Sequence, residues 1–430
     1  MIAIVFISFI LVALTASLVN KKSSYILSFF LVYTPLLPTL LRQIGIEGGS
    51  LLTRYLFLIF VLVIIKRNWN FSITLIKNNI VIYAIILLIT SMIVFNILSD
   101  NSLDPLVNEF QFYSFAYCFV PFFLIIFLLN SPKFLIDFVN SIPYWGILFV
   151  SVFILFFDFQ SIDYGDRFTF VQVTGFDTIA SSRIFAISLI ASFILILKKK
   201  KLNIYLLISA ILSLLFLLIA GQRGTLIGVV LGFTIFGYFN LSKKNLPSMF
   251  ISISALILLF YFRIIDLSSF QVFERLYELE NYKEFDRFQD YFTTWEIFKN
   301  NSFWAGEGSY GYFFITERDY PHNILLESMV DYGLLGFISM LSIISIGLYY
   351  SIYLLRGKSI IYEYKIIANI WIMLLVSVLV SGNIVNNAIF FIFTGILVIS
   401  RALTKAYEPA RKLRLQKAKN PTISLLNTTT

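Results

Sequence analysis

Apolar segments recur along most of this chain, separated by short polar stretches. Each segment is roughly 17–25 residues long, which is the length that an α-helix needs to cross a bilayer. A backbone inside a membrane must satisfy its own hydrogen bonds, so such segments are expected to be helices. The pattern predicts an all-α polytopic membrane protein with about thirteen transmembrane helices, in a range of about 12–14. The expected spans are 1–20, 25–41, 51–65, 79–98, 114–130, 142–157, 177–197, 202–220, 224–240, 248–265, 333–355, 366–382 and 387–403.

The longest polar stretch, 266–322, divides this pattern. We expect the transmembrane helices 1–10 in 1–265, one large outer loop containing short helices in 266–322, the transmembrane helices 11–13 in 323–403, and a basic cytoplasmic tail in 404–430. The first span is apolar from its first residue and has no basic region before it, so we expect a retained helix and not a cleaved signal peptide.

Aromatic residues recur at three- and four-residue spacing inside the large loop. They are Phe288, Tyr291, Phe292, Trp295 and Phe298. This spacing predicts an amphipathic helix. Such a helix could lie on the membrane surface or pack as an ordinary helix beneath the loop, and the sequence leaves both interpretations open.

Composition supports the membrane assignment and charge orients it. The chain is 59% hydrophobic and 13% charged, against about 25% charged in an ordinary soluble domain. Most lysines fall in alternate loops, which the positive-inside rule places in the cytoplasm. The N-terminus is then outside, the C-terminus cytoplasmic and the large loop outside. The net charge of +9 is thus explained by topology and contact with anionic membrane lipids, and we expect no nucleic-acid partner.

Arginine outnumbers lysine on the expected outer side. A guanidinium is a permanently charged, planar fork that suits bidentate contacts to phosphate, so these residues indicate an anion site at the membrane surface. The alternative is that individual arginines reach the interface or pair with nearby acids. The set comprises Arg42, Arg54, Arg167, Arg183, Arg223, Arg263, Arg275, Arg287 and Arg318.

Two residues are candidates for chemistry. Arg223 lies between Gly221 and Gly224 at the end of two spans, where glycines would let backbone N–H groups approach an anion; the alternative is a tight helical hairpin. His322, the only histidine, directly precedes a helix expected to begin at about Asn323. The positive end of the helix dipole disfavours a charged imidazole there, which leaves it able to accept a proton.

The start of that helix carries further polar residues. Glu327 and Asp331 are four apart and share a face, so with Asn323 they are candidates for orienting an acceptor hydroxyl, or they line a solvated helix end. Gly306, Gly308 and Gly311, upstream of the histidine, predict a flexible turn among aromatic residues. Motifs for nucleotide sugars, hydrolytic zinc and ATP are absent, and the one cysteine, Cys118, excludes a disulfide within one chain. We expect no metal and no cofactor.

These residues resemble the O-antigen ligase/polymerase family of bacterial envelope glycosyltransferases. The segment PHNILLESMVDYGLLG (321–336) is similar to the family's HN-x-x-L-E…GLLG signature, and GQRGTLIG (221–228) is similar to its arginine–glycine turn. The segment 286–311 resembles the approach to the histidine, although Ala305 stands where the family usually has proline before Gly306. Arg167, with Gly175 and the residues 178–180, resembles an earlier family element.

The resemblance implies a metal-independent glycosyltransferase of the inner membrane that uses an oligosaccharide carried on undecaprenyl pyrophosphate. It implies Arg223 and Arg287 as pyrophosphate clamps, with Arg183 and Arg167 as further members, and His322 as the catalytic residue. We expect a polymerase that joins repeat units for O-antigen, capsule or exopolysaccharide, and a chain-length regulator is a candidate partner. The rival is a ligase that transfers polymer to the lipid A core of lipopolysaccharide. A lipid-linked oligosaccharide flippase is the alternative from another class, which the nearly charge-free spans disfavour.

Overall fold

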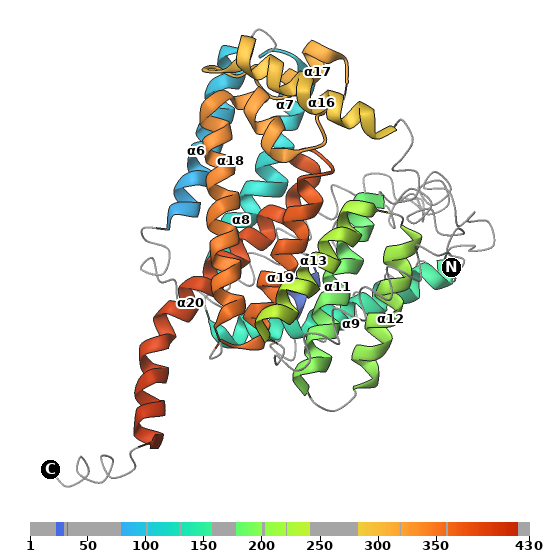
Figure 1. Ribbon diagram of the computed structural model, residues 1–430, viewed down its shortest axis with the longest axis vertical. Helices are drawn as coiled ribbons and strands as arrows, with labels where there is room; N and C mark the ends of the chain where they lie inside the picture. The colour runs from blue at the N-terminus through green and yellow to red at the C-terminus, as the bar shows by residue number, and fades with distance from the viewer. Residues whose placement is uncertain are drawn as a thin grey trace, which may run out of the picture.

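A computed structural model of the protein describes residues 23–29, 32, 79–99, 102–128, 131–156, 178–199, 203–220, 222–240, 283–318, 320–357 and 360–419. Every regular element in these ranges is helical, as the sequence predicts (Figure 1). The elements are α2 (Ser23–Ser28), α6 (Ile80–Leu98), α7 (Pro105–Tyr113), η3 (Ser114–Phe119), α8 (Val120–Leu128), α9 (Pro132–Phe156), α11 (Thr178–Lys199), α12 (Ile204–Ile219), α13 (Arg223–Asn240), α16 (Lys283–Ile297), η6 (Phe298–Ser302), α17 (Gly311–Thr316), α18 (Ile324–Arg356), α19 (Tyr362–Val378), η7 (Val385–Asn387) and α20 (Ala388–Lys419).

Six of the described helices are long and apolar enough to cross a membrane. They cover Ile80–Leu98, Pro105–Ile126, Pro132–Ser151, Ile179–Lys198, Ile324–Arg356 and Val385–Ala406. The all-α membrane class is therefore confirmed. The count of about thirteen spans stays a prediction, because the spans expected at 1–20, 51–65 and 248–265 lie outside the described residues and 25–41 lies mostly outside them.

Several helix ends differ from the hydropathy prediction. The span expected to begin at 114 starts at Pro105, where Asp104 accepts a hydrogen bond from the N–H of Leu106 and proline occupies the first helical position, a combination that favours a helix start. The span expected to begin at 142 starts at Pro132. Helix α20 continues to Lys419 through much of the expected basic tail. Hydropathy identifies only the apolar part of a helix, so it does not predict where a polar extension of the same helix begins or ends.

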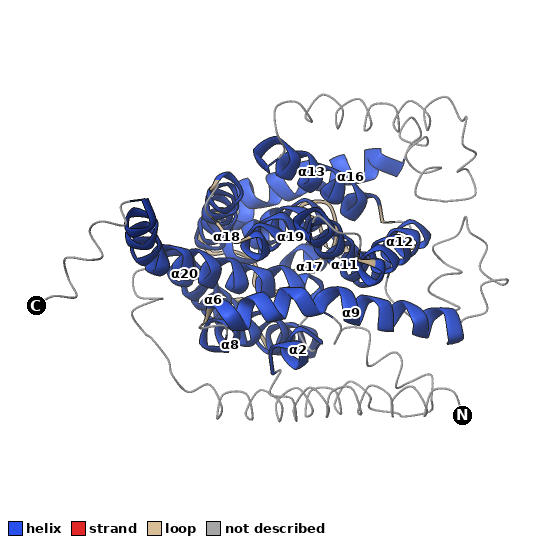
Figure 2. Ribbon diagram, turned by 90° about the horizontal axis from the view of Figure 1, so that it is seen from below, coloured by secondary structure: helices blue, strands red, loops and turns tan. Residues whose placement is uncertain are grey.

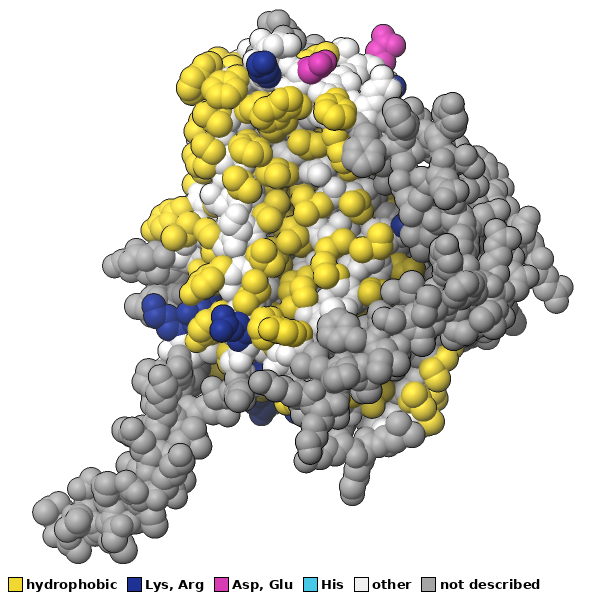
Figure 3. All heavy atoms as spheres, viewed as in Figure 1, with side chains coloured by type: hydrophobic (Ala, Val, Ile, Leu, Met, Phe, Trp, Pro, Cys, Tyr) yellow, Lys and Arg dark blue, Asp and Glu magenta, His cyan; other side chains and the backbone are white. Residues whose placement is uncertain are grey.

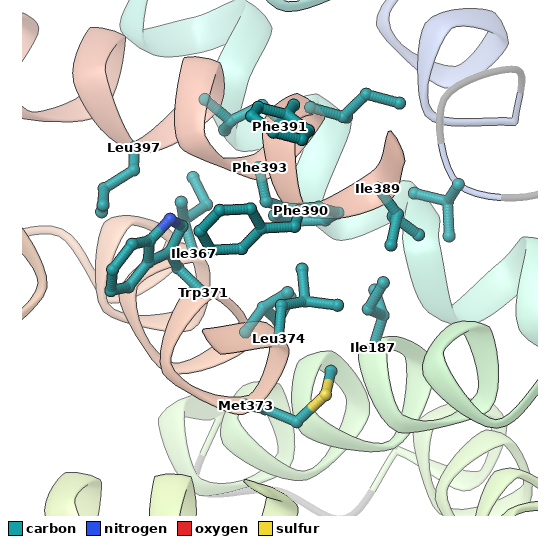
Figure 4. Close-up of a cluster of buried hydrophobic side chains, with 14 of the residues drawn as sticks. Ile187, Ile367, Trp371, Met373, Leu374, Ile389, Phe390, Phe391, Phe393 and Leu397 are labelled. Atoms are coloured by element: carbon teal, nitrogen blue, oxygen red, sulfur yellow. The ribbon is translucent and has the colours of Figure 1, made fainter. Parts of the chain in front are cut away.

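The core of the bundle lies where α19 and α20 pack together with α11 (Figure 4). Trp371 of α19 and Phe390 and Phe391 of α20 are fully buried, and the ring centroids of Trp371 and Phe390, and of Phe390 and Phe391, lie 5.6 Å apart. The indole N–H of Trp371 donates to the hydroxyl of Thr394 at 3.0 Å, which satisfies the one polar atom of this side chain.

A row of small residues brings α13 against α19. A Cβ on Gly228 would lie 2.6 Å from the carbonyl oxygen of Met373, whereas Gly224 and Gly232 face the side chains of Val380 and Asn369. Glycines at four-residue spacing allow two helix backbones to approach closely inside a membrane. Gly224 therefore takes part in helix packing, and the expectation that it opens the backbone to an anion stays a prediction.

Helices α6, α18, α19, α13, α11 and α12 run alongside one another, whereas α16 and α17 cross one end of the bundle (Figures 1 and 2). We call this the loop end. Hydrophobic side chains cover the face over α6 and α18, and charged side chains gather toward the two ends (Figure 3). At the opposite end Lys198 pairs with the buried carboxylate of Glu363 at 2.5 Å.

Substitution of Gly228 by alanine tests the contact between α13 and α19. The new methyl group would meet the backbone of Met373, and overpacking of this kind costs about 1–3 kcal/mol. We expect a lower melting temperature for the detergent-purified variant. The control is Val230→Ala, which removes atoms from an exposed position of the same helix. Equal melting temperatures for Gly228→Ala and the wild type would contradict the close approach.

Candidate functional site

The site is built around an interruption in α18. Tyr332 (φ −127°, ψ 17°) and Gly333 (φ 60°, ψ −156°) are non-helical inside this helix. The freed carbonyls of Val330 and Asp331 accept hydrogen bonds from the N–H groups of Glu307 and Gly308, at 3.0 and 2.8 Å. The loop 303–311 therefore supplies the backbone partners that the helix lacks at its break, as a buried polar backbone requires.

Glycine is necessary where this loop meets the helix. Gly306 has a φ of 59°, and a Cβ there would lie 2.6 Å from both the carbonyl oxygen of Asp331 and the nitrogen of Gly333. Next to it, the N–H of Ser309 donates to the side-chain oxygen of Asn96 on α6 at 2.6 Å. The glycines expected to form a flexible turn therefore belong to a hydrogen-bonded loop that is fixed on two helices.

His322 lies where the sequence predicts, one residue before the cap of α18. The oxygen of Asn323 accepts hydrogen bonds from Leu325 and Leu326, and its amide nitrogen donates to the carbonyl of Leu379 at 2.9 Å. Asn323 is expected to bind the acceptor, and in the structure its side chain caps α18 and binds the backbone at the end of α19. His322 has a φ of 54°, and its ring lies 4.6 Å from the ring of Tyr320.

Glu327 and Asp331 are buried, which excludes the interpretation of a solvated helix end. They are 3% and 1% exposed. The carboxylate of Glu327 accepts a hydrogen bond from the N–H of Ile384 at 2.9 Å, and that of Asp331 accepts one from Tyr312 at 3.4 Å. Both residues line a small hollow together with Phe110, Tyr310, Tyr312, Tyr320, Pro321 and Asn383.

A third carboxylate, that of Asp290, orients Tyr312 on the aromatic side of this hollow. Asp290 of α16 accepts a hydrogen bond from the hydroxyl of Tyr312 at 3.0 Å and pairs with Arg318. Burial, followed by the hydrogen bond to Asp290, raises the pKa of Tyr312 to about 12, so the phenol stays protonated and oriented. Sequence analysis placed Tyr312 among the aromatic residues of the glycine turn but did not single out Asp290, because the two residues meet only through folding.

Arg183 is fully buried and donates to three protein oxygens. Its Nε binds the hydroxyl of Ser377 at 2.8 Å, and its two terminal nitrogens bind the carbonyls of Asn386 and Ser381 at 3.0 and 3.1 Å. Gln222 donates to the hydroxyl of Ser381 at 2.9 Å. Arg183 thus ties α11 to the turn that links α19 and α20. The polar run SGNIVNN (381–387) between two apolar spans is the signal that could have indicated this site.

Arg223 and the histidine segment adjoin the same turn. Arg223 is the first residue of α13 and is half-buried. Its neighbour Gly224 faces Val380 in the turn after α19. Asn323, the neighbour of His322, donates a hydrogen bond to the carbonyl of Leu379 in the same turn. The structure therefore brings Arg223 and His322 to one end of the bundle. Helix α12 packs mainly on α11 and α9, whereas α13 packs mainly on α19, so the alternative of a tight helical hairpin stays a prediction. Arg287 lies on α16, at the loop end, and Arg167 lies outside the described residues.

Within the described ranges, no group of three or more His, Cys, Asp or Glu side chains is arranged to hold a metal ion. The polar groups at this end of the bundle include the guanidinium of Arg223, the imidazole of His322, two buried carboxylates and tyrosine hydroxyls. Such a set can bind an anion, accept a proton and hold hydroxyl groups of a sugar.

Replacement of Arg183 by lysine tests the role of its three hydrogen bonds. One ammonium group cannot reproduce a planar fork, and each buried acceptor left unpaired costs about 1–3 kcal/mol. We therefore expect a lower melting temperature and less protein in the membrane. Arg223→Lys, at the half-buried start of α13, is the matched comparison and should lose less stability. If both variants melt like the wild type, Arg183 does not support the turn.

A comparison with known families agrees with this geometry. Residues 208–341 match the family model described as O-antigen ligase, and no curated protein matches the chain. The matched stretch includes α13 with Arg223, the loop with Arg287 and the start of α18 with His322. It therefore confirms the resemblance found from the sequence: this multi-pass membrane protein carries, at 208–341, a domain of the O-antigen ligase family.

Proposed function

We propose that this chain is a polysaccharide polymerase that joins oligosaccharide repeat units carried on undecaprenyl pyrophosphate. The observation that carries the proposal is that Gly224 and Asn323, the residues next to Arg223 and His322, contact the same turn, 379–380, and that His322 lies beside a hollow lined by two buried carboxylates. The loop end would face the exterior, with the N-terminus outside and the C-terminus cytoplasmic, in agreement with the distribution of lysine.

The donor would bind through its pyrophosphate at Arg223. This residue begins α13, and a helix N-terminus favours a bound anion through its free N–H groups and its dipole. A guanidinium there can contact phosphate in bidentate fashion. The family resemblance adds Arg287 and Arg167 to the pyrophosphate site. We assign Arg183 to support of the turn instead, because its nitrogens are bound to protein oxygens.

The acceptor sugar would occupy the hollow between α7, the loop and α18. Its walls are the rings of Phe110, Tyr310 and Tyr320, and its polar atoms come from Glu327 and Asp331. Aromatic faces suit the apolar surface of a sugar ring, and carboxylates accept hydrogen bonds from its hydroxyls. The imidazole of His322 packs on Tyr320, so it lies beside this hollow.

In the proposed reaction, the acceptor hydroxyl oxygen bonds to the anomeric carbon of the donor as the bond from that carbon to the pyrophosphate oxygen breaks. His322 takes the proton of the attacking hydroxyl, as a general base. The departing undecaprenyl pyrophosphate gains negative charge, which fixed guanidinium groups stabilise as it forms. The arginines take the part that a metal ion plays in other glycosyl transfers, and the proposed enzyme needs no cofactor.

A ligase that transfers the glycan to the lipid A core is the second candidate, favoured by the description of the matching family. The two reactions share the donor and the chemistry and differ in the acceptor. Purified protein in liposomes can separate them when it receives a lipid-linked repeat unit with or without lipid A core. A ladder of products from the repeat unit alone supports the polymerase. Product only with the core supports the ligase, and no product with either acceptor overturns the proposal.

Substitution of His322 by asparagine tests the proton acceptor. Asparagine tolerates the left-handed backbone found at this position, so the substitution adds no backbone strain. It has no imidazole and therefore cannot replace the proton acceptor. We expect the transfer rate to fall by about 10²–10⁴-fold with an unchanged melting temperature. Glu317→Asn, at another left-handed position that is exposed, is the matched control and should retain activity. A His322→Asn variant with the wild-type rate would refute the role.

A further inference from the structure

Four aromatic side chains are exposed at the loop end, and we call them the aromatic surface: Phe292, Trp295, Phe303 and Trp304. Three of them are more exposed than buried, with Phe292 at 71%, Trp295 at 54% and Trp304 at 75%. None of these residues lines the hollow beside His322. Side chains of this size are usually buried in a protein that meets only water, so their exposure requires an explanation.

The opposite face of α16 is packed, which places the aromatic surface on the outward face. Ile297 and Phe298 are buried against Met329 and Val330 of α18. Asp290 and Thr294, about two turns and one turn before this contact, are buried as well. The helix is therefore anchored to the bundle along one side, and Phe292 and Trp295 project from the other.

Ring contacts join this surface to the membrane-facing side of α18. The ring centroid of Phe298 lies 5.9 Å from that of Trp295, 5.2 Å from that of Phe303 and 6.3 Å from that of Phe337 on α18. The ring centroids of Phe303 and Trp304 lie 4.8 Å apart. On α18 the next outward residues are Leu335, Ile338 and Leu341, all exposed. These three belong to a helix that is apolar enough to cross a membrane.

The backbone sets the level at which the aromatic residues lie. The N–H of Leu334 donates to the carbonyl of Phe303 at 2.9 Å, so Phe303 and Trp304 stand beside the first residue after the break in α18. That point is where the continuous apolar part of α18 begins. Helix α16 crosses the end of the bundle transverse to α18 (Figure 1), and the hydrophobic face over α18 reaches that end (Figure 3).

We propose that the aromatic surface inserts into the headgroup region of the bilayer and holds α16 in the plane of the membrane. Tryptophan prefers this zone because its ring is apolar and its N–H can bond to water or lipid. A helix that lies in the interface shows one apolar and one polar or packed face. Lys299 and Glu296 are both exposed beside the surface, so aromatic contact and not net charge supplies the binding. The partner is therefore the lipid surface itself.

Tryptophan fluorescence in lipid nanodiscs tests this directly and needs no enzymatic activity. The full chain is compared with a Trp295→Phe/Trp304→Phe variant, which keeps the rings and removes two of the five tryptophans. The difference between the two emission spectra reports these two indoles alone. Lipids brominated close to the headgroup should quench this difference more than lipids brominated deep in the acyl chain, and an aqueous quencher should have little effect.

Two outcomes would overturn the proposal. Strong quenching by the aqueous quencher without quenching by brominated lipid places the surface in water. Protection from both quenchers indicates that a protein, such as a second copy of the chain, covers it. The variant should have the melting temperature of the wild type, because the two exposed positions remain aromatic. A second variant, Trp295→Phe alone, repeats the measurement if the double variant is unstable, because its difference from the wild type reports Trp295.

Discussion

The backbone contact between the loop 303–308 and the broken part of α18 is the constraint on which the rest of the structure depends. A helix interrupted within an apolar bundle leaves carbonyl and N–H groups that water cannot satisfy, and here the loop satisfies them. Because the loop is fixed in this way, Tyr310 and Tyr312 are held over Glu327 and Asp331. One set of backbone hydrogen bonds therefore positions both walls of the hollow.

Arg183 performs a comparable task from the other side. Buried charge is expensive inside a membrane protein unless its donors are satisfied, and this guanidinium binds oxygens of Ser377, Ser381 and Asn386. The turn that it supports carries the backbone N–H that binds Glu327 and the carbonyl that binds Asn323. A fully buried arginine thus supports the turn beside the candidate site through hydrogen bonds to protein oxygens.

The loop end combines a polar hollow with an aromatic exterior. Helix α16 contributes to both, since Asp290 orients Tyr312 on its inner side while Trp295 is exposed on its outer side. An enzyme whose donor is a lipid must bring its polar chemistry to the level of the headgroups. A helix that is packed against the site and held at the interface would place the proposed pyrophosphate site at that level.

The sequence by itself determined the elements of this protein and the order of its candidate residues. Hydropathy and helix capping are local properties, so the all-α class, the start of α18 after His322 and the O-antigen ligase resemblance could be inferred from neighbouring residues. Only the tertiary structure decided which polar groups are buried and what they bind. The pairing of Arg183 with Asn386, of Asp290 with Tyr312, and of Gly306 with the break in α18 joins residues that are distant in the chain or on separate elements. No local pattern specifies such contacts, because they depend on how the helices pack.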